Sequence, residues 1–185
     1  LITGASGVIG GVAVQRMSDK YAFSALNRRP VDGIPCIQAD ISDFDSILPA
    51  FENVEMVLHL AAKVTGNEWE GIRDINLTGT YNVYEASRQS GVKRIVFAST
   101  GGTMTGYTND APYSDLQAGN YDSVPETWSM VDYTWPVRPS SLYGASKVFG
   151  EALGRYYSDT FGISVINIRI GRVLDTDRPK VRKDY

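Results

Sequence analysis

The stretch TGASGVIG at positions 3–10 decides the fold of this chain, because it sets three glycines between an apolar strand end and a helix. Gly4 permits a tight turn, Gly7 lets backbone approach a ligand closely, and Gly10 lets the helix pack near the sheet. The first turn of the helix then offers unpaired N–H groups to an anion such as a pyrophosphate. A strand before and a helix after this pattern favour a dinucleotide-binding turn over a purely structural one.

Working outward, short apolar runs alternate with helical segments. The sequence predicts strands at 1–3, 21–27, 34–38, 54–60, 94–98 and 164–170, and helices at 8–20, 43–51, 69–90 and 142–161. Ser42 is the expected N-cap of the second helix, and Gly91 and Gly162 end the last two. Apolar strands without polar alternation are typical of a parallel sheet covered by helices on both faces. We therefore expect an α/β fold, a doubly wound parallel sheet (Rossmann fold) with strand order 3-2-1-4-5-6.

Composition limits the partners of this chain. It has 185 residues, a 43% apolar share and a net charge of -3, which fit one domain and give no basic field for nucleic acid. No apolar run approaches the roughly 20 residues of a membrane span. The single cysteine, Cys36, suits a reducing compartment, so we expect a cytoplasmic protein. Both ends look cut, and we expect a longer natural protein whose C-terminal portion contributes to the substrate site.

A catalytic pair is predicted at the start of the last helix. Tyr143 and Lys147 are four positions apart, which places the phenol and the ammonium on one helix face. A cation near a phenol favours the phenolate and brings it into range as an acid or base. Ser99 and Thr100 end the fifth strand, where a hydroxyl can hold a substrate oxygen. The alternative for these two hydroxyls is simple capping of the strand end, and catalysis is favoured more for Thr100 than for Ser99.

The end of the second strand bears on the choice of cofactor. An acidic residue there holds the ribose 2′-hydroxyl of NAD, whereas an arginine favours the 2′-phosphate of NADP. Here Asn27 is followed by Arg28 and Arg29, with no acid, so NADP is favoured over NAD. The arginines could equally be a solvated turn. Asp40 and Ile41 follow the third strand and could flank the adenine, although Asp40 could instead cap the next helix.

Several motifs resemble one known family. They are TGASGVIG, HLAA at 59–62, NLTGT at 76–80, VKRIVFAST at 92–100 and YGASK at 143–147. Together they resemble the extended short-chain dehydrogenases/reductases, the NAD-dependent epimerase/dehydratase group. The stretches SLYGASKVFGEAL and NIRIG look most like uronate dehydrogenases and related sugar oxidoreductases. The resemblance runs through essentially the whole chain.

The resemblance implies roles for particular residues. Thr100, Tyr143 and Lys147 fall on the family's catalytic positions, and Ala61 and Ala62 on residues that pass close to the cofactor. Asn76 falls on a structural asparagine. The helix at 69–90 and the helix that carries Tyr143 commonly form a dimer interface in this family, which implies a homodimer.

Three departures limit the resemblance. Gly101 and Gly102 stand where dehydratases carry an Asp-Glu pair, which argues against water elimination. Arg172 stands where uronate dehydrogenases look to carry a small hydroxyl residue, which implies a changed substrate. The segment 100–141 is longer than usual, rich in aromatic residues and without a clear period. It could be a lid or wall of a sugar site, or an insertion that packs on itself or on another subunit.

The sequence thus predicts an NAD(P)-dependent oxidoreductase acting on a sugar or sugar-derived hydroxyl. A nucleotide-sugar epimerase with tightly bound cofactor is the alternative, and a non-catalytic dinucleotide sensor is disfavoured by the tyrosine. The expected cofactor-binding residues are Gly4, Ser6, Gly7, Val8, Ile9, Gly10, Asn27, Arg28, Arg29, Asp40, Ile41, Leu60, Ala61, Ala62, Ala98, Ser99, Tyr143 and Lys147. The expected substrate-binding residues are Lys63, Thr100, Gly101 and Arg172. No metal site is expected, because the only histidine, His59, has no cysteine or acidic cluster near it.

Overall fold

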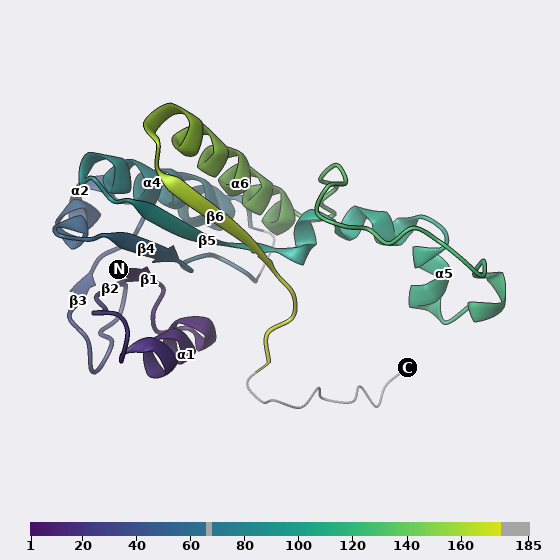
Figure 1. The fold of residues 1–185 in the computed structure, drawn as a ribbon, viewed down its shortest axis with the longest axis horizontal. Coiled ribbons are helices and arrows are strands. Elements are labelled where there is room, and N and C mark those ends of the chain that lie inside the picture. The colour runs from purple at the N-terminus through teal and green to yellow at the C-terminus, as the bar shows by residue number, and fades with distance from the viewer. Residues whose placement is uncertain (66–67, 175–185) are drawn as a thin grey trace.

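A six-stranded parallel sheet forms the centre of the computed structural model, which describes residues 1–65 and 68–174 (Figure 1). The strands are β1 (Ile2–Thr3), β2 (Ala25–Asn27), β3 (Cys36–Gln38), β4 (Met56–His59), β5 (Arg94–Thr100) and β6 (Ser164–Ile170). Their order is β3-β2-β1-β4-β5-β6, all parallel, which confirms the predicted doubly wound topology. All the strand ends that can bind a ligand therefore lie along one edge of the sheet.

Helices cover both faces of the sheet (Figure 1). On one side lies α1 (Val8–Met17), and on the other lie α2 (Phe44–Ile47), α4 (Gly79–Gln89) and α6 (Leu142–Phe161). The predicted helix at 69–90 consists of α3 (Trp69–Gly71), a π-helical turn over Ile72–Thr78, and α4. This helical stretch connects β4 to β5. The two strands pair in parallel, and the register runs from Met56 opposite Arg94 to His59 opposite Phe97.

Some predicted boundaries were wrong. Strands β2 and β3 are only three residues long, and α1 ends at Met17. The N-cap of α2 is Asp43, whose carboxylate accepts from the Ser46 N–H at 3.3 Å. Ser42 does not cap that helix, because its hydroxyl donates to the Asp40 carboxylate at 2.8 Å. A carboxylate cap is as effective as a hydroxyl, so the helix still forms, one residue further on.

The main core lies between β5 and the helices α4 and α6. Phe97 of β5 is fully buried and meets Tyr84 of α4 with ring centroids 6.3 Å apart. Tyr84 in turn packs on Tyr157 of α6 at 5.4 Å. Burying each such aromatic side chain contributes roughly 1.5–3 kcal/mol. This packing fixes α6, and with it the predicted catalytic pair, against the fifth strand.

The segment between β5 and α6 extends away from the sheet (Figure 1). It contains α5 (Tyr113–Ala118) and three 3-10 turns, Gly101–Thr103, Thr105–Asn109 and Tyr121–Ser123. Its two ends pair with each other, since Arg138 N–H donates to the Thr103 carbonyl at 2.8 Å. Tyr107 and Trp135 pack edge to face at 5.1 Å. The part nearest the sheet is thus ordered by its own backbone and aromatic contacts.

Within the described ranges, no helix has the length and hydropathy to cross a membrane.

Candidate cofactor and active site

A cavity of about 410 Å³ lies at the carboxyl edge of the sheet. It brings together parts of the glycine-rich turn, the residues after β4, the ends of β5 and β6, and the start of α6. The lining residues are Gly4, Gly7, Val8, Ile9, Gly10, Leu60, Ala62, Val64, Ala98, Ser99, Thr100, Tyr143, Lys147, Ile170, Gly171 and Val173. Segments from both ends of the described chain therefore meet in one site.

The glycine-rich turn has the backbone that its sequence predicts. Gly4 has a φ of +75°, and a Cβ there would lie 2.9 Å from the Ala61 nitrogen. A Cβ on Gly10 would lie 2.7 Å from the backbone of Ala5, so only glycine fits. Gly7 caps α1 without any side-chain hydrogen bond, which leaves the first helical N–H groups open toward the cavity. Free amides and the helix dipole favour an anion there, so the turn fits the pyrophosphate of a dinucleotide.

The end of β2 lies beside this turn. The Ser6 hydroxyl donates to Asn27 Oδ1 at 3.3 Å, and Asn27 Nδ2 donates to the Arg29 carbonyl at 2.7 Å. Arg28 and Arg29 are exposed. These four residues do not line the cavity, but their contacts place the end of β2 next to the glycine turn.

The two residues predicted to flank the adenine have local contacts instead. The Asp40 carboxylate accepts from Ser42 N–H at 2.9 Å, which makes a turn before α2. Ile41 is 5% exposed and belongs to the core, where its carbonyl accepts from Asn82 Nδ2 at 2.8 Å. Neither lines the cavity, so their contact with a cofactor stays a prediction.

Tyr143 and Lys147 lie on one face of α6, as their spacing predicts. Ser141 is the N-cap of this helix, and its hydroxyl accepts from Gly144 N–H at 3.0 Å. Lys147 is only 3% exposed, and its ammonium lies 5.7 Å from the Tyr143 ring centroid and 4.7 Å from that of Phe97. A cation over an aromatic ring is stabilised by the ring quadrupole, so Phe97 helps to keep the charge in this buried place.

Burial affects the pKa values of both groups. It lowers the pKa of Lys147 to about 8, which leaves the ammonium mostly protonated at neutral pH. It raises the pKa of Tyr143. The sequence predicts that Lys147 lowers the pKa of the Tyr143 phenol toward neutral pH. In the chain without a ligand, the desolvation of the phenol is the larger effect. The phenol of Tyr143 therefore stays protonated in this state, and the predicted role as a base would require a further positive charge nearby.

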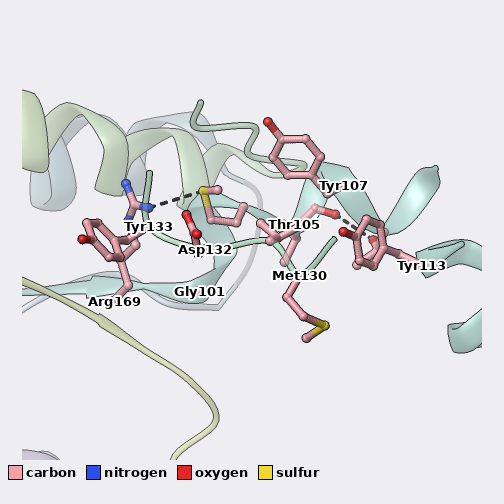
Figure 2. Close-up of a pocket in the computed structure, with 11 residues that line it drawn as sticks. Gly101, Thr105, Tyr107, Tyr113, Met130, Asp132, Tyr133 and Arg169 are labelled. Atoms are coloured by element: carbon pink, nitrogen blue, oxygen red, sulfur yellow. Dashed lines mark hydrogen bonds between the residues drawn. The ribbon is translucent and has the colours of Figure 1, made fainter. Parts of the chain in front are cut away.

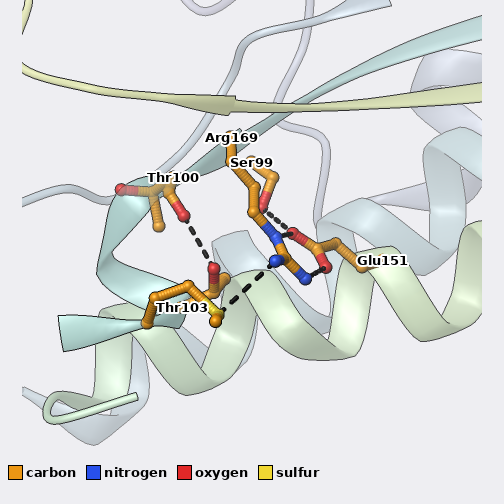
Figure 3. A network of polar contacts seen from close by, with 6 residues as sticks. Ser99, Thr100, Thr103, Glu151 and Arg169 are labelled. Atoms are coloured by element: carbon orange, nitrogen blue, oxygen red, sulfur yellow. Dashed lines mark hydrogen bonds and ion pairs between the residues drawn. The ribbon is translucent and has the colours of Figure 1, made fainter. Parts of the chain in front are cut away.

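The two hydroxyls at the end of β5 differ in their partners (Figure 3). Ser99 is 3% exposed and donates to Oε1 of Glu151, on α6. That carboxylate also accepts from Arg169 Nε at 2.9 Å and Nη2 at 2.7 Å. The Ser99 hydroxyl proton is thus donated to a partly buried ion pair, which favours a structural role for this hydroxyl.

Thr100 faces the cavity with its proton available. Its Oγ1 accepts from Gly102 N–H at 3.1 Å, an interaction that leaves the Thr100 hydroxyl proton free for a ligand. The Thr100 carbonyl accepts from the Thr103 hydroxyl at 2.9 Å, which fixes the turn after the strand. The geometry therefore favours Thr100 over Ser99 as the group that holds a substrate oxygen.

Asn76 joins two parts of the site. It is 2% exposed, its Oδ1 accepts from Lys63 N–H at 2.7 Å, and its Nδ2 donates to the Lys63 carbonyl at 3.0 Å. Nδ2 also donates at 3.0 Å to the Oγ of Ser146, which lies between the two residues of the predicted catalytic pair in the sequence of α6. This asparagine holds the segment after β4 against α6, which agrees with the structural role that the resemblance implies.

The other predicted substrate-binding residues are not brought together. The Lys63 ammonium lies 3.7 Å from Glu68 Oε2 in an exposed ion pair. Arg172 is exposed, and Gly101 lines a second cavity. The cofactor cavity is also lined by four residues that the sequence did not predict, Val64, Ile170, Gly171 and Val173. The end of β6 could have been included, because every parallel strand of the sheet ends at this edge.

His59 is a buried structural residue beside the site. Its Nδ1 lies 2.7 Å from Thr3 Oγ1 and its Nε2 lies 3.2 Å from Thr80 Oγ1. Both ring nitrogens are thus satisfied by hydroxyls, which suits a neutral imidazole. No group of three residues that could hold a metal ion occurs in the part of the chain that the structure describes.

The fold and the glycine turn define a dinucleotide-binding protein. A family model described as the NAD dependent epimerase/dehydratase family matches residues 1–174, and the chain belongs to this family. The L-arabinose 1-dehydrogenase (NAD(P)(+)) of Haloferax volcanii is 37% identical over 185 residues, covering 99% of this chain and 70% of that protein. The uronate dehydrogenase of Pseudomonas putida is 32% identical over 177 residues, covering 92% of this chain and 59% of that protein.

Solved structures show the same relationship. A crystal structure of a mutant uronate dehydrogenase from Agrobacterium tumefaciens, complexed with NAD, superimposes with a TM-score of 0.72 at 31% identity. The superposition covers 89% of this chain and 57% of that one. The chain thus spans between 57% and 70% of the length of these three proteins.

Proposed function

We propose that this chain is the cofactor-binding and catalytic part of an NAD(P)-dependent oxidoreductase that acts on a sugar hydroxyl. One observation carries the proposal: Thr100, Tyr143 and Lys147 line the same cavity as the glycine-rich turn. A proton-transfer group, a cation and a hydroxyl beside a dinucleotide site are the parts that alcohol oxidation requires.

Each of the three residues has a distinct part in the reaction. Thr100 donates a hydrogen bond to the substrate oxygen and orients it. Tyr143 takes the hydroxyl proton as the alcohol is oxidised and returns it in reduction. Lys147 keeps a buried positive charge 5.7 Å from the phenol ring and so favours the phenolate. The glycine-rich turn and Lys147 would hold a nicotinamide dinucleotide, which would supply the hydride acceptor and, when oxidised, the further positive charge that the half-buried phenol needs.

NADP is the favoured cofactor. Arg28 and Arg29 are exposed directly after Asn27, and Asn27 contacts Ser6 of the glycine turn. Two guanidinium groups at this position suit a 2′-phosphate, and no carboxylate of the Asn27–Arg29 stretch repels it. The name of the Haloferax volcanii relative includes both forms, NAD(P)(+), so use of NAD as well is expected.

A homodimer in the cytoplasm completes the proposal. The helices expected at the interface expose large apolar side chains, with Tyr81 on α4 47% exposed and Tyr156 on α6 53% exposed. Burying such side chains between two copies would remove apolar area from water. Sedimentation of the protein would test it, since a monomer at micromolar concentration contradicts the proposed dimer.

The test of the activity is the change in nicotinamide absorbance with NAD or NADP and a panel of sugars, uronates and nucleotide-sugars. We expect steady formation of reduced cofactor, and a loss of roughly 10²–10⁴-fold in turnover for Tyr143→Phe. Tyr21→Phe is the matched control, because Tyr21 is 51% exposed and does not line the cavity.

Other outcomes would support the alternatives. Interconversion of sugar isomers without net reduction would favour an epimerase with retained cofactor, which the family description includes. Unchanged biological function in Tyr143→Phe would favour a dinucleotide sensor and overturn both enzyme proposals.

A further inference from the structure

Three buried polar side chains form one chain of hydrogen bonds beside the cofactor cavity. Thr3 ends β1, His59 ends β4 and Thr80 is the second residue of α4, and none of them is more than 2% exposed. His59 Nδ1 lies 2.7 Å from Thr3 Oγ1, and His59 Nε2 lies 3.2 Å from Thr80 Oγ1. Three separate stretches of the sequence therefore meet at one imidazole.

The chain of hydrogen bonds reaches the cofactor cavity through the backbone of Ala61. The Thr3 carbonyl accepts from Leu60 N–H at 3.1 Å, and the Thr3 hydroxyl oxygen accepts from Ala61 N–H at 3.2 Å. A Cβ on Gly4 would lie 2.9 Å from the Ala61 nitrogen, so these two backbones are in contact. Gly4, Leu60 and Ala62 line the cavity. Thr3 therefore fixes where the segment after β4 lies against the glycine-rich turn.

The lengths of these hydrogen bonds indicate which ring nitrogen carries the proton. Burial lowers the pKa of His59 to about 3, so the imidazole is neutral and has one donor and one acceptor nitrogen. The Thr3 oxygen already accepts from Ala61, and its 2.7 Å distance to Nδ1 is the usual length for a hydroxyl donor. The 3.2 Å from Nε2 to Thr80 is long for a hydroxyl donor but within the range of an N–H donor. Both lengths fit an imidazole with its proton on Nε2.

None of the three side chains lines the cofactor cavity. They are also absent from the lining of the second cavity, of about 490 Å³, where the long segment meets the sheet (Figure 2). The Phe97 ring packs against the imidazole with centroids 5.6 Å apart, and both rings are fully buried. His59 is thus held by packing as well as by hydrogen bonds. Any effect of His59 on a ligand must pass through the backbone that it fixes.

We infer that His59, with its proton on Nε2, is a positioning residue for cofactor binding, because it directs the Thr3 hydroxyl oxygen to the Ala61 N–H and so holds the segment after β4 against the glycine-rich turn. Thr80 completes the chain, since its oxygen accepts from Nε2–H. Without that oxygen, Nε2–H would be a buried donor without a partner, which is costly enough to displace the ring and with it Thr3. The inference deepens the proposed function and rests on it for the nature of the ligand, a nicotinamide dinucleotide.

The first test reads the protonation of the imidazole directly. His59 is the only histidine in the sequence, so protein made without a histidine tag gives one pair of ring-nitrogen signals in a nitrogen-15 NMR spectrum. Protonated and unprotonated ring nitrogens have well separated shifts, and their couplings to the ring hydrogens tell Nδ1 from Nε2. We expect a proton on Nε2 alone at neutral pH. A proton on Nδ1, or a mixture of the two tautomers, would overturn the inference.

The second test is a fluorescence titration with reduced NADP or reduced NAD, whichever the wild type binds more tightly. Thr80→Val keeps the shape of the side chain but removes the acceptor of Nε2–H, so it should raise the Kd about five- to tenfold. Thr80→Ser should restore the wild-type Kd. Thr3→Val should raise the Kd further, because it also leaves the Ala61 N–H without its acceptor. Ser87→Ala is the matched control, since Ser87 is a fully buried hydroxyl on α4 that donates to the Val83 carbonyl and lines neither cavity.

The outcomes separate this inference from the proposed activity. A merely structural chain of hydrogen bonds would make Thr80→Val less stable to urea and leave its Kd unchanged, and that result would overturn the inference. An equal rise in Kd for Ser87→Ala would overturn it as well. The expected changes in Kd without turnover of any sugar would support the inference and contradict the oxidoreductase. A wild type that binds neither dinucleotide would overturn both.

Discussion

Acid should destabilise this protein through one side chain, His59. It is the only histidine in the sequence, it is fully buried on β4, and Lys147 lies close enough to repel an added proton. Burial, and then the Lys147 charge, lower the pKa of His59 to about 3. An unfolded histidine titrates near 6.5. At a pH between these two pKa values, His59 binds a proton in the unfolded chain but stays neutral in the folded chain.

The sign and size of the effect follow from this difference. Because the folded-state pKa is lowered, the contribution to stability is complete above pH 6.5 and is lost as the pH falls toward 3. Each pH unit below 6.5 lowers the free energy of unfolding by about 1.4 kcal/mol. Between pH 7 and pH 5 the free energy of unfolding should therefore fall by about 2 kcal/mol. This amount depends on the unfolded-state pKa alone, provided that the folded-state value stays well below 5.

The assay is urea unfolding at pH 7, 6 and 5 for the wild type and His59→Gln. Glutamine does not titrate, so the variant should be less stable at pH 7 but lose much less over this range. Glu85, whose pKa is lowered to about 2 by hydrogen bonds from Arg88 above all, loses its contribution only below pH 4.5. A wild type whose stability is unchanged between pH 7 and 5, or a variant that loses as much as the wild type, would refute the reasoning.

Two further predictions concern packing, and thermal or urea unfolding checks both. Gly10→Ala should lower the free energy of unfolding by about 1–3 kcal/mol, because its Cβ would lie 2.7 Å from the Ala5 backbone. Gly11→Ala, with nothing within 4 Å, should raise it by up to about 1 kcal/mol, and equal midpoints would contradict the argument. Tyr84→Phe removes a buried hydroxyl with no hydrogen-bond partner among the described residues, so stability should rise or stay within about 1 kcal/mol. A loss above roughly 2 kcal/mol would show that the hydroxyl has a partner.

Most of the fold could be predicted from the sequence. The helix at 142–161 and the strand at 164–170 have the predicted bounds, since each carries a long regular pattern and Gly162 ends the helix at a φ of +70°. The strands at 21–27 and 34–38 were predicted too long, because apolar residues beside a strand look the same whether or not they pair. Pairing depends on the neighbouring strand, and β2 and β3 share only three residue pairs.

The candidate site was predictable where local spacing decides it. Gly4 to Gly10 and the Tyr143–Lys147 pair are each set by one turn or one helix face, so their residues lie together in any helix or turn of that kind. The substrate side was not predictable in this way. Lys63 and Arg172 follow different strands, and neither side chain lines the cofactor cavity.

The sequence by itself determined the order of strands and helices, the glycine turn and the placing of Tyr143 and Lys147 on one helix face. Only the tertiary structure decided which distant groups meet. Ser99 finds Glu151 across 52 positions, and Asn76 finds Ser146 across 70. It also decided that burial raises the pKa of Tyr143 and that the long aromatic segment lines a second, open cavity together with Arg169 of β6. The reason is physical: periodicity fixes the face on which a side chain lies, whereas its partner and its exposure to water depend on how whole elements pack.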